Sequence, residues 1–513
     1  MRIPRRPWLL AAVALIALLV GVWAFWPGPE RVRAHAHLDR PPRIKPDYAG
    51  IVIPPNIAPL NFAILEPAGR YFVRVYGQRG DAIVVTSGDG DIRIPPDRWK
   101  ALLADNVGAD VKVDVFAHDR QDGWCQYETI TNKVAAERID PVLVYRFIRP
   151  IYSFWRHTAI YQRNIEGYDR RLIFDGGELN RGCVNCHTFC RNSPEKMTIG
   201  MRSKDYGSGT LMAIDGRVDT IKAKWGYTSW HPSGRLAAYS INKVRQFFHT
   251  TGPECRDVID MDSAILYYEV ATKETKTAPG LSSPDRLETY PEWSPDGKYL
   301  YYCSAAIPWM DRGSVPPPNF DKVRYDLMRM PYDIQTDTWG RPEVILSAAE
   351  IGGSILLPRV SPDGRCLVFA MCDYGCFPVF RESSDLYLMD LAVLKYKKLE
   401  INSEQSESWH SFSANGRWLA FSSKRERGPF TRTYFSYLDP NGVAHKPFVL
   451  PQEDPAYYDS LLFTYSVPEL LTGPISVSPR ALAAAVRDKE QIAVTSPIVT
   501  GATPRLSSVP ERE

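Results

Sequence analysis

One short pattern occurs four times between Ser229 and Ser423, and it constrains the fold more than any other feature of the sequence. Each copy joins two apolar segments through a tight turn that ends in Gly. The copies are SWHPSGRLAAYS from Ser229, EWSPDGKYLYYC from Glu292, RVSPDGRCLVFA from Arg359 and SFSANGRWLAFSS from Ser411, with turn glycines Gly234, Gly297, Gly364 and Gly416. In three copies Asp or Asn precedes the Gly, which favours a tight turn between two strands. Each copy therefore predicts a β-hairpin.

Further paired-strand patterns alternate with these hairpins. They are GTLMAIDGRVDTIKAK, SAILYYEVATKETKTAP, YDLMRMPYDIQTDTWGRPEVIL, SDLYLMDLAVLKYKKLEI and RTYFSYLDPNGVAHKPFVL. Four-stranded units repeated at intervals of roughly fifty to seventy residues are typical of β-propeller blades. The copies resemble the PD40 repeats of TolB-type propellers over about residues 205–465. We expect a propeller of five or six blades across residues 205–470, closed by the segment DSLLFTYSVPEL.

A second informative feature is the pentapeptide Cys183-Val184-Asn185-Cys186-His187. C-x-x-C-H is the attachment site of a c-type haem, in which two thiols bind the porphyrin covalently and the His supplies an axial nitrogen to the iron. Zinc, a redox pair and a structural disulfide are the alternatives. A zinc site that also used Cys190 would crowd four ligands into eight residues, and the Gly-rich segment before Cys183 does not predict the strand-to-helix setting of a redox pair. We expect one covalent haem c on Cys183 and Cys186, with His187 as axial ligand.

The second axial ligand decides what such an iron does. A Met or His there makes an electron carrier, whereas an open position lets the iron bind a small molecule. The candidates are Met197 or Met201, soon after His187, and His249 in the insertion RQFFHTTGPECRD. Core packing is the alternative for each Met. Two further histidines, His231 and His410, are expected to be structural and to bond backbone carbonyls.

The N-terminus predicts a membrane anchor. Three Arg residues precede an apolar run from Trp8 to Trp26, which is long enough to cross a bilayer as a helix, and no small-x-small cleavage site follows it. Residues 1–26 are therefore expected to form an uncleaved, single-pass signal anchor. The resemblance of the haem motif to that of bacterial c-type cytochromes implies attachment outside the cytoplasmic membrane, so the chain after Pro27 is expected in the periplasm.

The regions between anchor and propeller differ in composition. The predicted units are a Pro-rich stalk (27–47), a small Ig-like β-sandwich of short alternating strands (48–132), a short helical haem-binding connector (133–204) and, after the propeller, a disordered tail with one helical segment (471–513). The whole order resembles TolB-like proteins that carry one haem c motif. Cys372 and Cys376 flank Gly375 and are a candidate disulfide, with buried free thiols as the alternative.

The function follows from the haem and the propeller together. A net charge of +3 without a basic stripe argues against nucleic acid as a partner. The absence of a G-x-S-x-G elbow, zincin helix or P-loop favours an electron carrier or binding protein over an enzyme. We expect a membrane-anchored periplasmic monohaem cytochrome that transfers one electron at a time and docks a redox partner protein on its propeller. The alternative is a propeller that binds a protein or glycan of the cell envelope, with the haem as a sensor or structural staple.

Overall fold

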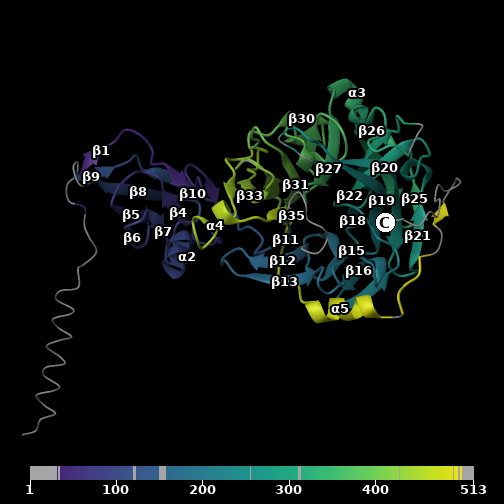
Figure 1. Cartoon of the computed structure of the whole chain (residues 1–513), viewed down its shortest axis with the longest axis horizontal. Coiled ribbons are helices and arrows are strands. Elements are labelled where there is room, and N and C mark those ends of the chain that lie inside the picture. Colours follow the sequence, from purple (N-terminus) through teal and green to yellow (C-terminus); the bar gives the residue numbers. More distant parts are fainter. Residues whose placement is uncertain are drawn as a thin grey trace, which may run out of the picture.

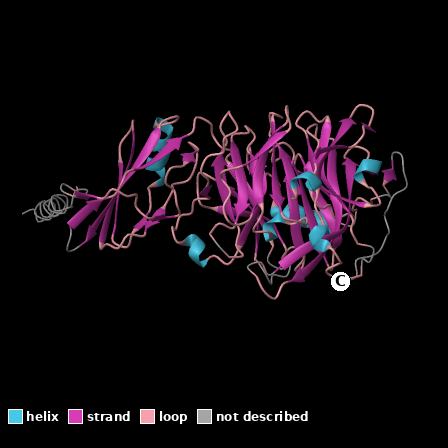
Figure 2. Ribbon diagram, turned by 90° about the horizontal axis from the view of Figure 1, so that it is seen from above, coloured by secondary structure: helices cyan, strands magenta, loops and turns pink. Residues whose placement is uncertain are grey.

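The structure is a computed structural model that describes residues 32, 35–119, 123–149, 158–252, 254, 256–309, 313–426, 428–488, 490–494 and 497–499. It has two parts, a small N-terminal domain and a larger ring of β-sheets (Figures 1 and 2). Strands dominate both parts, which confirms the prediction of a mainly β protein.

Six consecutive sheets form the ring, and each contains at least four strands. In chain order their strands are β11 (Val142–Ile148), β12 (Ala159–Asn164) and β13 (Arg170–Asp175) with β35 (Thr464–Leu471); β14 (Cys183–Phe189), β15 (Lys196–Ser203), β16 (Gly207–Ile214) and β17 (Arg217–Ile221); β18 (Thr228–Trp230), β19 (Leu236–Phe248), β20 (Arg256–Glu269) and β21 (Glu274–Thr277) with β36 (Ile498–Val499); β22 (Arg286–Trp293), β23 (Tyr299–Ala306), β24 (Asp326–Asp333), β25 (Thr338–Trp339) and β26 (Glu343–Leu346); β27 (Ser354–Val360), β28 (Cys366–Cys372), β29 (Asp385–Asp390) and β30 (Lys395–Lys398); and β31 (Glu407–Phe412), β32 (Trp418–Ser423), β33 (Arg432–Tyr437) and β34 (Phe448–Val449).

The C-terminal strand closes the ring. The inner strands contact one another in the order β14, β18, β22, β27, β31 and β35. β35 then pairs antiparallel with β11, so that Val142 lies opposite Leu471 and Ile148 opposite Thr464. The chain thus forms a six-bladed β-propeller whose first blade takes its innermost strand from the far end of the sequence. The predicted closure by the segment around β35 is confirmed.

The four predicted hairpin turns are also present. Gly234, Gly297, Gly364 and Gly416 have φ values of 67°, 73°, 73° and 68°, in the left-handed region that glycine adopts without strain. Each turn joins the inner strand of a blade to its second strand. The turn residues of the repeat therefore determine the inner hairpin in four of the six blades.

Two of these glycines offer a matched test of turn packing. Gly297 and Gly364 share the same φ, but a Cβ on Gly297 would collide with the ring of His231, whereas a Cβ on Gly364 would meet open space. Gly364→Ala should lower the free energy of unfolding by about 1–2 kcal/mol through backbone strain alone. Gly297→Ala should cost about 1–3 kcal/mol more, because the imidazole must move. Chemical denaturation of both variants measures the difference, and equal losses would contradict the collision.

The predicted helical connector is wrong for the described residues between 133 and 204. They form β11 to β15, and the ring begins at β11 rather than at residue 205. The aromatic and β-branched residues of VLVYRFI and AIYQRN suit a pleated, half-buried surface, and this preference outweighs their helix-like spacing. Pro141 directly precedes β11 instead of interrupting a helix.

The N-terminal domain contains two sheets and one helix. The larger sheet holds β1 (Ala36–His37), β3 (Val52–Ile53), β5 (Arg70–Gly77), β6 (Ile83–Ser87), β8 (Asp110–Asp119), β9 (Gly123–Gln126) and β10 (Ile130–Val134); the smaller holds β2 (Ile44–Lys45), β4 (Phe62–Ile64) and β7 (Asp91–Ile92); the helix is α2 (Pro96–Asp105). The Ig-like character of this domain stays a prediction. β1 and β2 belong to these sheets, so the prediction of a free stalk is wrong for residues 35–47.

One apolar core runs from the N-terminal domain into the last blade. It includes Ile53 and Leu103 of the domain together with Trp418 and Phe435 of the ring. The indole nitrogen of Trp418 also donates to the Glu137 carbonyl at 3.2 Å. The domain is therefore packed against the propeller rather than tethered to it.

The ends of the chain lie partly outside the described residues. Residues 1–26, the predicted anchor, are outside them, and of the helices that are described none has both the length and the apolarity to cross a membrane. After the ring, α5 (Pro479–Arg487) buries Leu482 and Val486 against the sheets. The prediction of a disordered tail is therefore wrong for this stretch, although the prediction of one helical segment is confirmed. The remaining helical turns are α3 (Ala348–Ile351), α4 (Tyr457–Ser460), η2 (Pro279–Leu281), η3 (Phe320–Lys322) and η4 (Pro378–Phe380).

Candidate functional site

The C-x-x-C-H motif lies on β14, the innermost strand of the second blade. Cys183 pairs with Arg202 of β15, and the register shifts between Asn185 and Thr188. Cys186 and His187 therefore occupy a bulge in the ladder. Cys183 carries a free thiol and is 6% exposed, while the side chain of Cys186 lies outside the description. The motif thus lies on one side of the propeller axis, and the pairing of β14 with β15 holds it there.

His187 is a buried imidazole without hydrogen bonds. It is 3% exposed, and neither ring nitrogen has a hydrogen-bond partner among the described residues. The Val467 carbonyl lies near enough to favour protonation slightly, but it does not form a hydrogen bond of good geometry. Burial, followed by the charge of Arg146, lowers the pKa of His187 to about 3. The ring is therefore neutral at physiological pH, which is the form that ligates a metal.

Two arginines supply positive charge beside this imidazole. Arg146 of β11 donates to the side-chain oxygen of Asn185 and, at 3.1 Å, to the hydroxyl of Ser466. Arg359 of β27 also lowers the pKa of His187. Guanidinium groups pair well with carboxylates, so this charge suits the propionates of a haem.

Arg359 also lies between two carboxylates, which come from two other blades. Its two terminal nitrogens lie 3.2 Å from Glu292 of β22 and 3.7 Å from Glu469 of β35, and the Ser229 hydroxyl donates to Glu292 at 3.1 Å. We call Glu292, Arg359 and Glu469 the axial charge cluster. Burial raises the pKa of both glutamates, that of Glu469 to about 7. Two carboxylates thus share one guanidinium next to the haem motif.

The axial charge cluster was not foreseen, although the repeat carried a signal for it. Glu292 and Arg359 each stand five residues before a turn glycine, so they occupy the same position of the template. Equivalent residues of different blades meet near the axis of a propeller. Opposite charges at one template position could therefore have predicted an ion pair between blades.

The two histidines expected to be structural do bond backbone carbonyls. Nε2 of His231 lies 3.1 Å from the Gly297 carbonyl, and its Nδ1 lies 2.8 Å from the Ser233 hydroxyl. Nε2 of His410 lies 2.9 Å from the Val368 carbonyl. The prediction is confirmed for both, and His187 differs from them in having no such partner.

His410 should make the protein less stable in acid. Burial lowers its pKa from 6.5 to about 3 in spite of the bond to Val368. Between these values the unfolded chain binds a proton that the folded chain does not, so stability falls as the pH is lowered through this window. The limiting slope is about 1.4 kcal/mol per pH unit. His410→Gln should remove this contribution from the pH dependence of unfolding by urea.

The matched control for this measurement is His445→Gln. The side chain of His445 is 38% exposed, and its variant measures the change that comes from replacing a histidine at the surface. An unaltered slope in His410→Gln would show that His410 is protonated in the folded protein.

The candidates for the second axial ligand lie in different surroundings. Met197 and Met201 are each 1% exposed and belong to an apolar cluster that also holds Val184 and Phe189. The side chain of His249 is exposed, and its Nε2 lies 3.7 Å from a carboxylate oxygen of Asp257. In the described part of the chain no hydrogen bond or ring contact joins His249 to His187. The second axial ligand stays a prediction.

The candidate disulfide between Cys372 and Cys376 is wrong. Both residues carry free, buried thiols. Cys372 Sγ lies 3.4 Å from the Tyr374 carbonyl, and Cys376 Sγ lies 3.6 Å from the Val258 carbonyl on β20. Each thiol therefore has a different backbone acceptor, and the alternative of buried free thiols holds.

The residues of the motif fit a covalent haem in their chemistry. Two cysteines and a following His supply the thioether and nitrogen donors of the c-type pattern. The unpartnered ring nitrogens of His187 are the structural observation in favour, because a buried polar atom without a bond costs free energy that a ligand restores. Among the described residues no group of three or more His, Cys, Asp or Glu is arranged to hold a metal ion.

Comparison with known proteins yields likeness in fold alone. No family model and no curated protein matches the chain. Among solved structures, TolB from Acinetobacter baumannii is 14% identical over 70% of this chain and 79% of its own, with a TM-score of 0.40. An oligogalacturonate lyase from Vibrio parahaemolyticus is 12% identical over 74% of this chain and 94% of its own, with a TM-score of 0.33. Hydrazine synthase from Kuenenia stuttgartiensis is 14% identical over 48% of this chain and 75% of its own, with a TM-score of 0.28. The first two are β-propeller proteins.

Proposed function

We propose that this protein is a monohaem c-type cytochrome with a propeller as its docking domain. Cys183 and Cys186 would hold the porphyrin covalently, and His187 would be the axial ligand. The observation that carries the proposal is the imidazole of His187, which is buried, neutral and without a hydrogen-bond partner among the described residues.

The surrounding residues have separate roles in this proposal. β14 holds the motif rigidly, because it pairs with β15 and is enclosed by neighbouring blades. Arg146 would balance part of the negative charge of the propionates, whereas Arg359 is already shared by Glu292 and Glu469. The haem would supply reversible one-electron redox chemistry of its iron. The protein groups around it would set the potential through burial and charge.

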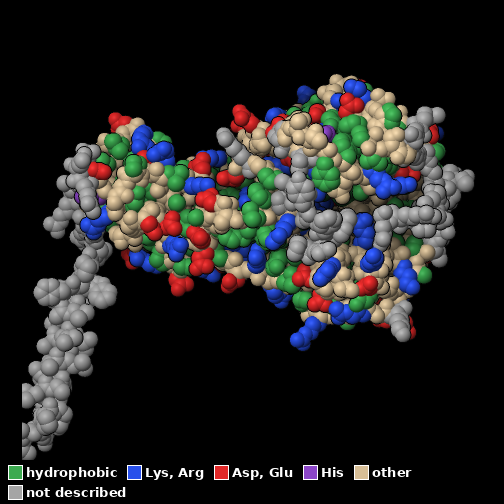
Figure 3. Space-filling view, in the orientation of Figure 1, with side chains coloured by type: hydrophobic (Ala, Val, Ile, Leu, Met, Phe, Trp, Pro, Cys, Tyr) green, Lys and Arg blue, Asp and Glu red, His purple; other side chains and the backbone are tan. Residues whose placement is uncertain are grey.

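The cellular setting is part of the same proposal. Residues 1–26 would anchor the chain in the bacterial cytoplasmic membrane, with the propeller in the periplasm. A redox partner protein would dock on the propeller. Figure 3 shows basic and acidic side chains intermixed on the face in view, without a continuous stripe of one sign, which supports a protein rather than a nucleic acid as partner.

The test is the redox chemistry of the full chain produced in a bacterium that attaches haem c. We expect the denatured chain to show the mass of one added haem, and a reduced-minus-oxidised spectrum to titrate as a single one-electron centre. Carbon monoxide should not bind the ferrous protein if a second axial ligand is present. Binding would instead favour the sensor function, and a chain without the added mass would refute both haem functions.

A further inference from the structure

The two longest strands of the ring, β19 and β20, form a hairpin that extends beyond its own blade. The innermost strand of that blade, β18, pairs only with residues 237–239 of β19. β19 nevertheless continues to Phe248, and β20 pairs with it over this extension, from Arg256 onward. We call residues 241–248 the β19 edge, because no described strand pairs with the side of β19 that faces away from β20 there.

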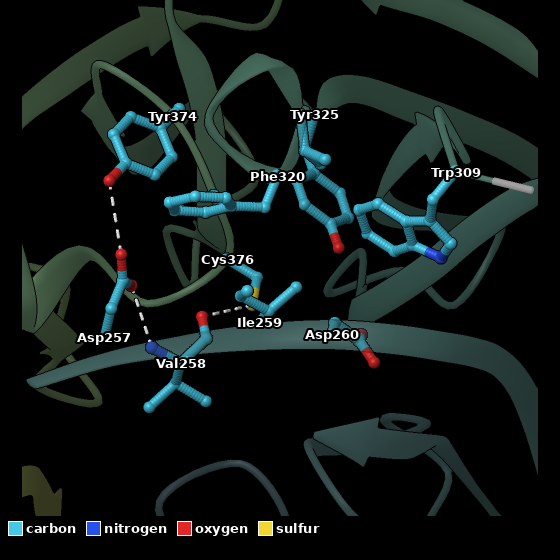
Figure 4. A pocket seen from close by; sticks show the side chains of 11 residues that line it. Asp257, Val258, Ile259, Asp260, Trp309, Phe320, Tyr325, Tyr374 and Cys376 are labelled. Carbon is cyan, nitrogen blue, oxygen red and sulfur yellow. Dashed lines mark hydrogen bonds between the residues drawn. The ribbon is translucent and has the colours of Figure 1, made fainter. Parts of the chain in front are cut away.

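The β20 side of this hairpin is fixed to the fifth and sixth blades. Asp257 of β20 forms an ion pair with Arg381, which lies between β28 and β29 of the fifth blade. Figure 4 shows the Tyr374 hydroxyl of the same blade directed at Asp257, to which it donates at 3.2 Å. Glu254, just before β20, forms a second ion pair with Lys424 of the sixth blade. β20 is therefore held in place, and β19 forms the exposed side of the hairpin.

Solvent reaches the β19 edge although the strand beside it is buried. The residues of β20 from Asp257 to Asp260 are at most 6% exposed. Their neighbours on β19 are open: Val244 is 38% and Phe248 55% exposed, and residues 243, 245 and 246 are exposed as well. A strand edge of this kind presents a row of unpaired N–H and C=O groups, which is a template for pairing with another strand.

The backbone groups that face outward can be assigned from the pairing at Ser240. The Ser240 N–H donates to the Tyr227 carbonyl at 2.9 Å, on the side of β19 that faces away from β20. The register shift farther along the hairpin adds its extra residue to β20, so the alternation of β19 continues without interruption. The outward N–H and C=O groups of the edge are therefore those of Val244, Gln246 and Phe248.

The side chains of the β19 edge are basic on one face and apolar on the other. Lys243 and Arg245 share one face by the period of two, and Val244 and Phe248 share the opposite face. Neither cation forms an ion pair with a described residue. Carboxylates on an added strand would pair with both, whereas a second copy of this edge would bring four cations into one small sheet. The charge thus favours an acidic segment of another protein over self-association.

We propose that the β19 edge docks an extended, acidic segment of a partner protein by strand addition. The segment would pair with the outward backbone groups of Val244, Gln246 and Phe248 and place carboxylates near Lys243 and Arg245. It would extend the sheet of the third blade beyond the end of β18. The proposal rests on the proposed function only in that it supplies a docking site for the partner. The haem takes no part in it, so the haem titration and the binding test below can fail separately.

The test is fluorescence polarisation of a labelled peptide, Asp-Val-Glu-Val-Asp-Val-Glu, titrated with the full chain. We expect saturable binding. The same peptide N-methylated at its interior amides should not bind, because it keeps the charge but cannot pair as a strand. Lys243→Ala/Arg245→Ala should weaken binding about fivefold to tenfold. Gln246→Pro should abolish it, because proline removes an outward donor at a position where an edge strand tolerates it.

The matched control is Lys395→Ala/Lys397→Ala, which removes two exposed cations from the outer strand β30 and should bind the peptide like the wild type. Equal weakening by the two double variants, or full binding of the N-methylated peptide, would indicate unspecific charge attraction and overturn the proposal. A wild type without saturable binding would also overturn it. If Gln246→Pro fails to fold, the N-methylated peptide on the wild type decides the question.

Sedimentation of the wild type tests the other occupant of the edge. We expect no association between copies of the chain through β19. A dimer that is lost in Lys243→Ala/Arg245→Ala or in Gln246→Pro, but kept in Lys395→Ala/Lys397→Ala, would assign the β19 edge to a second copy and overturn the proposal.

Discussion

The double variant Cys183→Ala/Cys186→Ala is expected to carry no covalent haem at all. Each thiol forms one of the two bonds to the porphyrin, so the denatured double variant should lack the added mass and should not stain for peroxidase activity. Each single variant should retain at most one bond and give a lower yield of haem-bearing chain. His187→Ala should keep the added mass but change the visible spectrum, because it alters a ligand of the iron.

Cys190→Ala is the matched control for these variants. Cys190 is also 6% exposed and follows the motif closely, with its Sγ 3.8 Å from the His231 carbonyl. It lies outside the pentapeptide, so its variant should stain like the wild type. Staining by the double variant would contradict covalent attachment at the motif. Stoichiometric zinc in wild-type protein that lacks haem would identify the site as zinc.

Removal of β35 is expected to abolish the folded state. A chain that ends at Phe463 loses a strand of which seven of eight residues are buried, including Leu470 and Leu471. It also leaves one edge of β11 unpaired at the inner side of the ring. Total stabilities of domains are only about 5–15 kcal/mol, and losing several fully buried apolar side chains at about 2–5 kcal/mol each exceeds that. We expect insoluble protein, or loss of the cooperative thermal transition in circular dichroism.

A chain that ends at Val499 is the control for this truncation. It lacks only residues 500–513, which lie outside the described structure, and it keeps α5 and β36. It should unfold like the full chain. A cooperative transition at an unchanged temperature in the shorter chain would show that β35 does not close the ring.

The blades that could be predicted from the sequence are those whose hairpin turns contain characteristic turn residues. A left-handed glycine after Asp or Asn determines a hairpin locally, so the turns at Gly297, Gly364 and Gly416 were evident from the sequence. The turn between β14 and β15 has no such signal, and β11 completes its blade with a strand more than three hundred residues away. No local pattern reports pairing at that separation, which is why the first blade and the first two strands of the second were taken for a connector.

The same distinction between local and long-range signals applies to the haem motif and to the axial charge cluster. The C-x-x-C-H motif is contiguous, so its donors were predicted, but its place on an innermost strand was not. Glu292 meets Arg359 from the preceding blade, and Glu469 is brought to it only by closure of the ring. Sites assembled between blades become visible only when the blades are placed.

The enclosure of Cys183 within a paired inner strand dictates an order of events during biogenesis. A porphyrin cannot reach a thiol that is 6% exposed and flanked by sheet on a completed ring. In the proposed cytochrome the bond would therefore form while this stretch is still an open polypeptide, and a molecule that finished folding first would not become holoprotein. The yield of holoprotein would then depend on whether haem is attached before the second blade folds. Slower folding of this blade should raise the fraction of chains that carry haem.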